Sequence, residues 1–151
     1  MKTKLINLTK SLINRKSVTP VDDGAIEVLK KKLQVLGFVN TELIFKERDH
    51  EDVLNLFSFL KNGSNKAKTL CFAGHTDVVP AGNLKSWKYN PFEGKETKDK
   101  IYGRGASDMK GAIAAWANAC ENVLSNHKLD ISLAMLITGD EEGVAINGRK
   151  K

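Results

Sequence analysis

Three short clusters of acidic residues carry the side chains that could bind metal ions. The first is the stretch 74–77, with the sequence GHTD. Side chains two residues apart in an extended chain point the same way, so His75 and Asp77 are predicted to project together. A carboxylate beside an imidazole holds one ring nitrogen and orients the other toward a cation. Taken alone, this cluster also fits a turn aspartate beside an incidental histidine.

The second cluster is the stretch 103–111, GRGASDMKG, with glycines at both ends that favour tight backbone turns. A helix is predicted to begin at about Asp108. The aspartate could therefore be a helix N-cap, which is the commonest role of this residue type at a helix start. A carboxylate in this position can also bridge two cations, and the cluster alone favours the cap.

The third cluster, TGDEEG at 138–143, directly follows an apolar stretch. Three consecutive acids at the end of a buried strand repel one another, and a bound dication would offset this repulsion. The alternative is a solvated acidic loop.

Together the three clusters predict a metal centre better than any one of them does. One histidine and several carboxylates form a mixed nitrogen and oxygen donor set that suits zinc or a similar divalent ion. Two such ions about 3.5–4 Å apart can polarise a carbonyl group and supply hydroxide near neutral pH. One carboxylate of an adjacent pair can bind metal while the other transfers the proton. The sequence contains no Gly-x-Ser-x-Gly elbow and no phosphate-binding loop, which argues against serine hydrolases and kinases.

The elements that must position these clusters follow from hydrophobic periodicity. Helices alternate with strands, which predicts an α/β layered fold, and such folds bind ligands beyond the carboxyl ends of strands. The last strand is almost wholly apolar, as expected of a sheet covered on both faces. Asn62-Gly63 is a strong turn signal between two strands. The predicted helices are 4–14, 25–36 and 110–126, and the predicted strands are 42–45, 53–60, 69–73, 100–102 and 131–138, with a long irregular segment at 74–105.

Composition and charge set broad limits on function. The 151 residues are enough for one domain, and fractions of 41% hydrophobic and 28% charged residues are ordinary for a globular protein. No apolar run approaches the roughly 18 residues of a membrane helix, and no signal peptide is recognisable, so a cytoplasmic location is expected. The net charge of +6 comes from scattered lysines without a nucleic-acid-binding motif. Cys71 and Cys120 are predicted to be buried free thiols.

The stretches 74–80, 103–111 and 140–143 resemble the metallopeptidase family M20, and within it the desuccinylase branch. The resemblance covers essentially the whole chain, in order and with family-like spacing. It implies a zinc-exopeptidase-like catalytic domain with a mixed sheet flanked by helices. Gly139 departs from the family pattern, which usually has a small hydroxyl residue there, and we expect this to change local flexibility more than chemistry.

The resemblance also implies roles for five residues of these clusters. His75 would ligate one of two zinc ions, for which cobalt could substitute, and Asp77 would fix the imidazole ring. Asp108 would bridge both ions and Glu142 would ligate the second. Glu141 would be the general base that activates water and later protonates the amine.

The implied reaction is hydrolysis of the small molecule N-succinyl-LL-diaminopimelate to succinate and LL-diaminopimelate, in diaminopimelate and lysine synthesis. No nucleic acid or membrane partner is expected, and the full-length form is expected to be a homodimer. Two alternatives stay open. One is another M20 deacylase or peptidase, such as an acetylornithine deacetylase-like enzyme. The other is an inactive, truncated remnant.

The resemblance further implies that residues 1–151 form the amino-terminal part of the catalytic domain. The family takes another carboxylate ligand from beyond the glutamate pair and a histidine from nearer its carboxyl terminus. We expect both ligands, the inserted dimerisation domain and the rest of the catalytic domain to lie outside these residues. His50 and His127 do not occupy family positions. The 151-residue chain alone is therefore expected to be inactive.

Overall fold

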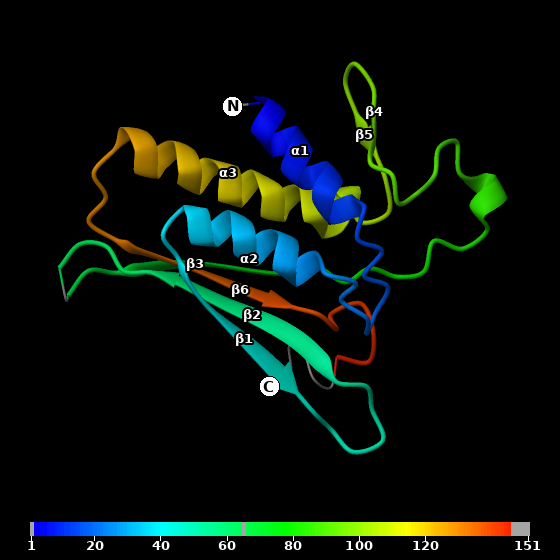
Figure 1. Ribbon diagram of the computed structural model, residues 1–151, viewed down its shortest axis with the longest axis horizontal. Helices are drawn as coiled ribbons and strands as arrows, with labels where there is room; N and C mark the ends of the chain where they lie inside the picture. The colour runs from blue at the N-terminus through cyan, green and yellow to red at the C-terminus, as the bar shows by residue number, and fades with distance from the viewer. Residues whose placement is uncertain (1, 65, 146–151) are drawn as a thin grey trace.

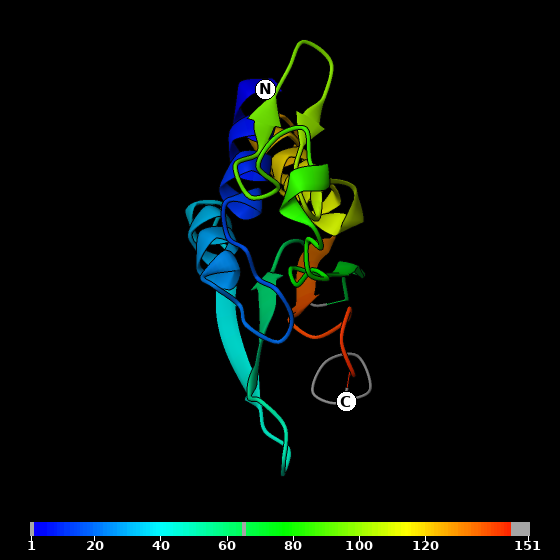
Figure 2. The ribbon, with the colours of Figure 1, turned by 90° about the vertical axis from the view of Figure 1, so that its right-hand side faces the viewer.

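The computed structural model describes residues 2–64 and 66–145. Within these ranges three α-helices pack on one face of a four-stranded sheet, and a small two-stranded ribbon extends away from it (Figures 1 and 2). The α/β fold class with a mixed sheet is thus confirmed. The elements are α1 (Lys2–Ile13), α2 (Ala25–Val35), β1 (Val39–Phe45), β2 (Val53–Leu60), β3 (Thr69–His75), η1 (Leu84–Ser86), β4 (Lys95–Glu96), β5 (Ile101–Tyr102), η2 (Ala106–Lys110), α3 (Gly111–Asn126) and β6 (Ser132–Thr138).

The order of the strands in the main sheet brings two of the acidic clusters together. The order is β1-β2-β6-β3. The pairs β1–β2 and β2–β6 are antiparallel, and β3 runs parallel to β6. In the parallel pair His75 lies opposite Thr138, so both strands end at the same edge of the sheet. The chain therefore leaves β3 toward Asp77 and leaves β6 toward the glutamate pair at neighbouring points.

The hydrophobic core lies between the helices and the sheet. Because side chains alternate along a strand, every second residue of β2 and β6 points into this core. These residues include Leu56, Met135 and Ile137, which are fully buried. The helices contribute to the same cluster Leu29, Leu33, Ile113 and Ala117.

Most of the predicted elements are confirmed. The helix at 25–36 ends as expected before Gly37, which has a positive φ of 90°. The strand predicted at 42–45 begins earlier, at Val39, because it pairs along its whole length with β2. The chain turns at Gly63 as expected, but this turn does not join paired strands, since β6 lies between β2 and β3.

One prediction about burial is wrong and another stays a prediction. The apolar β6 predicted a sheet covered on both faces, and within the described ranges the helices cover one of them. On the other face Phe57 and Leu136 are each 37% exposed. Cys71 was predicted to be buried, but it lies on that uncovered face and is exposed. Cys120 is buried in α3, and burial raises the pKa of its thiol to about 11.

The long irregular segment is ordered by aromatic residues, as the sequence suggested. The indole of Trp87 donates a hydrogen bond to the carbonyl of Ala81 and lies under the guanidinium of Arg104. Tyr89 packs edge-to-face against Tyr102 of β5.

None of the helices in the described ranges is long and apolar enough to cross a membrane.

Candidate metal centre

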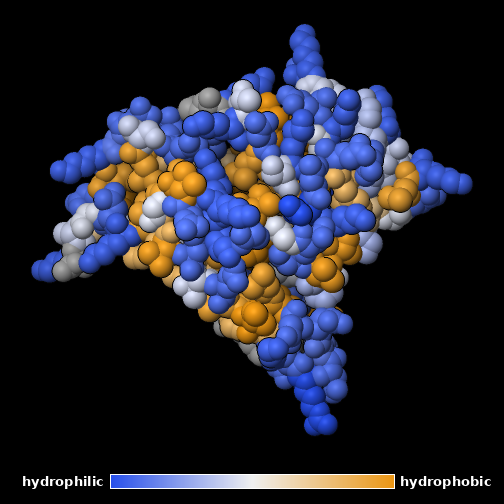
Figure 3. Space-filling view, in the orientation of Figure 1, coloured by the Kyte–Doolittle hydropathy of each residue, from blue (hydrophilic) through white to orange (hydrophobic). Residues whose placement is uncertain are grey.

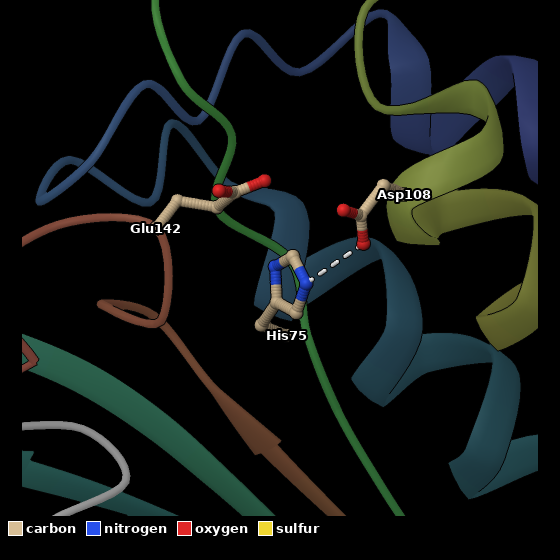
Figure 4. Close-up of side chains that lie close together, drawn as sticks. All are labelled: His75, Asp108 and Glu142. Atoms are coloured by element: carbon tan, nitrogen blue, oxygen red, sulfur yellow. Dashed lines mark hydrogen bonds and ion pairs between the residues drawn. The ribbon is translucent and has the colours of Figure 1, made fainter.

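Three side chains from three separate segments meet at the edge where β3 and β6 end. His75, Asp108 and Glu142 each offer one donor atom, and these atoms all lie within 4.8 Å of one another. Figure 4 shows His75 at the end of β3, Asp108 at the start of the segment leading into α3, and Glu142 on the loop that follows β6. The structure therefore brings together the three residues that the sequence predicted as metal ligands.

The imidazole of His75 is held on both sides. Its Nδ1 atom lies 3.0 Å from the carbonyl oxygen of Asp77 and 3.5 Å from a carboxylate oxygen of the same residue. Its Nε2 atom lies 3.2 Å from Oδ1 of Asp108. Burial lowers the pKa of His75, but the hydrogen bonds to Asp77 and the charges of Asp77 and Glu141 outweigh it and raise the pKa to about 9. A cation that binds Nε2 must therefore displace a proton at neutral pH.

Asp77 connects the first cluster to the third. Its two carboxylate oxygens accept hydrogen bonds from the backbone amides of Glu141 (3.2 Å) and Glu142 (2.9 Å). Burial alone would raise the pKa of Asp77, but the bonds from His75 and from these two amides lower it overall. The carboxylate is thus ionised and orients the histidine and the glutamate pair at the same time.

Asp108 does not cap a helix, so the interpretation that its cluster alone favoured is wrong. Its backbone is extended (φ −129°, ψ 99°) inside the distorted turn η2, and α3 begins three residues later at Gly111. Its side chain is 74% exposed, with Oδ1 directed at His75. The carboxylate is therefore available to ligands beyond His75.

The loop after β6 is not a freely solvated acidic loop. Asp140 is buried and accepts a hydrogen bond from the hydroxyl of Thr19. Burial, with the negative charge of Asp108 next in size, raises the pKa of Glu142. Glu141 places a carboxylate oxygen 3.8 Å from Nε2 of His75, beside the three donors.

These residues fit a divalent cation. One imidazole nitrogen and two carboxylate oxygens are donor types that zinc binds in proteins, and they converge here. Burial first, and then the negative charges of Asp108, Glu141 and Asp77, disfavour the ionised form of Glu142, and a dication would offset both effects. A cavity of about 600 Å³ opens beside His75, Asp108 and Glu141, with Leu43 and Met109 on its apolar side.

Three further residues around the centre were missed from the sequence. Asn55 and Thr19 contact the loop after β6. Lys110 is fully buried and donates to the carbonyl of Arg15 (2.6 Å), and burial lowers the pKa of its amine to about 8. Asn55 could have been singled out from the sequence, because it is the one polar residue at the otherwise apolar start of a predicted strand. A buried amide there needs hydrogen-bond partners. Nothing local in the sequence marks Thr19.

Comparison with known proteins agrees with this geometry. The chain is 48% identical to succinyl-diaminopimelate desuccinylase of Pelagibacter ubique over 147 residues, which are 97% of this chain and 38% of that protein. It is 44% identical to the enzyme of the same name from Beijerinckia indica, over 100% of this chain and 39% of that protein. The chain thus spans less than two fifths of the length of these curated relatives.

Solved structures share the fold. Human carnosine dipeptidase 1 superposes with a TM-score of 0.84 at 26% identity, covering 97% of this chain and 34% of that one. A metallo-carboxypeptidase of the M20 family from Sulfolobus solfataricus superposes with a TM-score of 0.70 at 26% identity. The match covers 92% of this chain and 31% of that one. The model of peptidase family M20/M25/M40 matches residues 71–151, more than half of the chain and all three acidic clusters. The chain belongs to peptidase family M20/M25/M40.

Proposed function

We propose that the whole protein hydrolyses the amide bond of N-succinyl-LL-diaminopimelate, with divalent cations, to give succinate and LL-diaminopimelate. The observation that carries this proposal is the convergence of His75, Asp108 and Glu142 beside Glu141. The substrate is argued from relatives that are 44–48% identical and are named for this reaction. The products would serve diaminopimelate and lysine synthesis.

His75, Asp108 and Glu142 would hold the cations, zinc in the first place and cobalt as a substitute. We propose two ions, and Asp108 would help to hold both, because its side chain is 74% exposed and its Oδ1 atom is the one directed at His75. Divalent ions bound here would polarise the amide carbonyl and make water more acidic. Asp77 would keep the imidazole and the glutamate pair in their orientations through its contacts with all three residues.

Glu141 is the proposed general base. It lies next to the donors, so its carboxylate can take a proton from the water that attacks the carbonyl carbon. The same group can then deliver that proton to the nitrogen as the carbon–nitrogen bond breaks. The acid produced is succinate and the amine produced is diaminopimelate, which balances the reaction.

The test is succinate release by the zinc-loaded whole protein from N-succinyl-LL-diaminopimelate, compared with acetate release from N-acetylornithine and with cleavage of a dipeptide. We expect a preference for the succinyl substrate, and we expect Glu141→Gln to lower kcat by at least about a thousandfold while cation binding persists. Glu27→Gln, the same change on the exposed face of α2, should leave the rate unchanged. A preference for N-acetylornithine or the dipeptide would replace the proposed substrate, and full activity of Glu141→Gln would remove the proposed base.

For the 151-residue chain by itself we propose cation binding without turnover. The described residues supply three donors, which leave two cations short of the four ligands that zinc usually has. Titration with Zn²⁺ and an assay of succinate release check both parts, and robust hydrolysis by this chain would contradict the second. The cytoplasmic location, the homodimer and the assignment of residues 1–151 to one part of the catalytic domain stay predictions.

A further inference from the structure

The four residues 139–142, here named the acidic turn, are held by side chains from three other segments. Each bond is made to a different residue of the turn, so the turn is fixed at every position. The partners are Asn55 of β2 on the amide of Gly139, Thr19 on the carboxylate of Asp140, and Asp77 on the amides of Glu141 and Glu142.

Asn55 is the partner at the point where the chain leaves β6. Its Oδ1 atom accepts a hydrogen bond from the amide of Gly139 at 3.2 Å. Its Nδ2 atom faces the carbonyls of Leu43 and Val53 at 3.5 and 3.4 Å. Asn55 is 1% exposed, so water cannot take over these bonds without a rearrangement of the strand. One amide thus provides the acceptor for the turn and anchors itself to β1 and β2.

Gly139 approaches β2 so closely that a side chain at this position would require the backbone to shift. A Cβ atom there would lie 2.6 Å from the carbonyl oxygen of Leu54. The backbone of the turn is therefore pressed against the strand that carries Asn55, and the short side chain of Asn55 reaches it. The contact couples the position of β2 to the first residue of the turn.

We propose that Asn55 is a positioning residue for the acidic turn. It fixes the exit of the chain from β6 and so sets where Glu141 and Glu142 stand relative to His75. This inference rests on the proposed function, in which those glutamates act as base and ligand. Asn55 also lines the cavity beside His75, and its neutral amide adds no charge to the crowded carboxylates.

An asparagine meets these demands where its closest analogues do not. Aspartate would turn an oxygen toward the carbonyls of Leu43 and Val53 and add a negative charge beside Glu141. Leucine has nearly the same size but cannot accept the bond from Gly139. Serine is shorter and adds no bulk, so it removes the contact with the least disturbance of β2.

The experiment compares Asn55→Leu and Asn55→Ser with the same two changes at Asn40. Asn40 is a matched control because it lies on β1, accepts a bond from Ser58, and donates to backbone carbonyls, away from the turn. Amide hydrogen exchange of the metal-free 151-residue chain is followed by NMR. We expect the amides of residues 139–142 to exchange at least about tenfold faster in the Asn55 variants and at the wild-type rate in the Asn40 variants, after correction for global stability.

The second readout is the affinity for Co²⁺ alone, measured by titration. We expect about a tenfold loss for the Asn55 variants and none for the Asn40 variants. Unchanged exchange at residues 139–142 in Asn55→Ser would overturn the inference. So would equal losses of Co²⁺ affinity at the two sites. If the wild-type chain binds no Co²⁺, the proposed metal centre fails, whereas the exchange rates still decide whether Asn55 holds the turn.

Discussion

Asp77 shows how much a single residue contributes to this centre. Its carboxylate lies against the imidazole of His75 and accepts the backbone amides of Glu141 and Glu142. The side chain of Asp77 is 1% exposed, and hydrogen bonds to an ionised group are stronger in such surroundings than in water. A residue that lies behind the predicted ligands thus determines the arrangement of ligand and base together.

We predict that Asp77→Asn lowers the affinity for Zn²⁺ by about 10- to 100-fold, because an amide removes the negative charge and one of its three acceptor contacts. Isothermal titration calorimetry of the 151-residue chain measures this. Asp140→Asn is the control in the same turn, since asparagine keeps the oxygen that Thr19 contacts. If both variants lost the same Zn²⁺ affinity, the loss would come from removing a negative charge near the centre. The contacts that Asp77 makes would then not explain it.

At the scale of elements, one glutamate ties the three helices together. Glu121 of α3 accepts hydrogen bonds from Lys4 of α1 (2.6 Å) and Lys32 of α2 (2.5 Å). These bonds lower the pKa of Glu121 to about 2. The helix layer that covers the core is therefore linked by charge as well as by apolar packing.

The pKa of Glu121 predicts a pH dependence of stability. Because the pKa is depressed in the folded state, the stabilisation is present above the ordinary carboxyl pKa of about 4.5 and is lost as pH falls toward 2. Lys4 is 66% exposed, and solvent screens the pair, so we expect a contribution of about 1 kcal/mol. Urea unfolding should show wild type more stable than Glu121→Gln at pH 6, with the difference shrinking by pH 2.5. A difference that is constant across this range would contradict the prediction.

At the scale of the whole molecule, the two faces of the sheet differ. The helices cover one face, whereas the other exposes Phe57 and Leu136, which lie opposite each other on β2 and β6. Figure 3 shows that the projecting ends of the molecule are mostly hydrophilic and that hydrophobic residues gather on the body between them. Exposed apolar surface of this kind favours contact with other apolar groups.

We predict that the 151-residue chain binds the dye ANS on this uncovered face. Phe57→Lys should reduce the dye fluorescence, because it places a charge in the middle of the apolar surface. Val35→Lys at the end of α2 adds the same charge at an exposed valine in the helix layer and should have little effect. A reduction of equal size in both variants would place the dye elsewhere.

Local pattern predicted the elements well but not their arrangement. Hydrophobic periodicity predicts the ranges of β2 and α3, and the positive φ of Gly37 explains why α2 ends before it. Both signals depend on residues that are close together in the sequence. The neighbour of β2 could not be predicted this way. The turn at Asn62-Gly63 favours a hairpin, yet β6, some seventy residues later in the chain, pairs with β2 instead. Strand pairing depends on packing between distant segments, which a local turn signal does not report.

The sequence by itself determined which residues could bind metal, since residue types, their position after strands and the resemblance to a family singled out His75, Asp108 and Glu142. Only the tertiary structure decided that their donor atoms converge, because the parallel pairing of β3 with β6 places two strand ends side by side. It also decided that Asp108 is no helix cap and that Asn55 and Asp77 hold the acidic turn. Side-chain contacts between distant segments follow from the packed fold, and no local pattern encodes them.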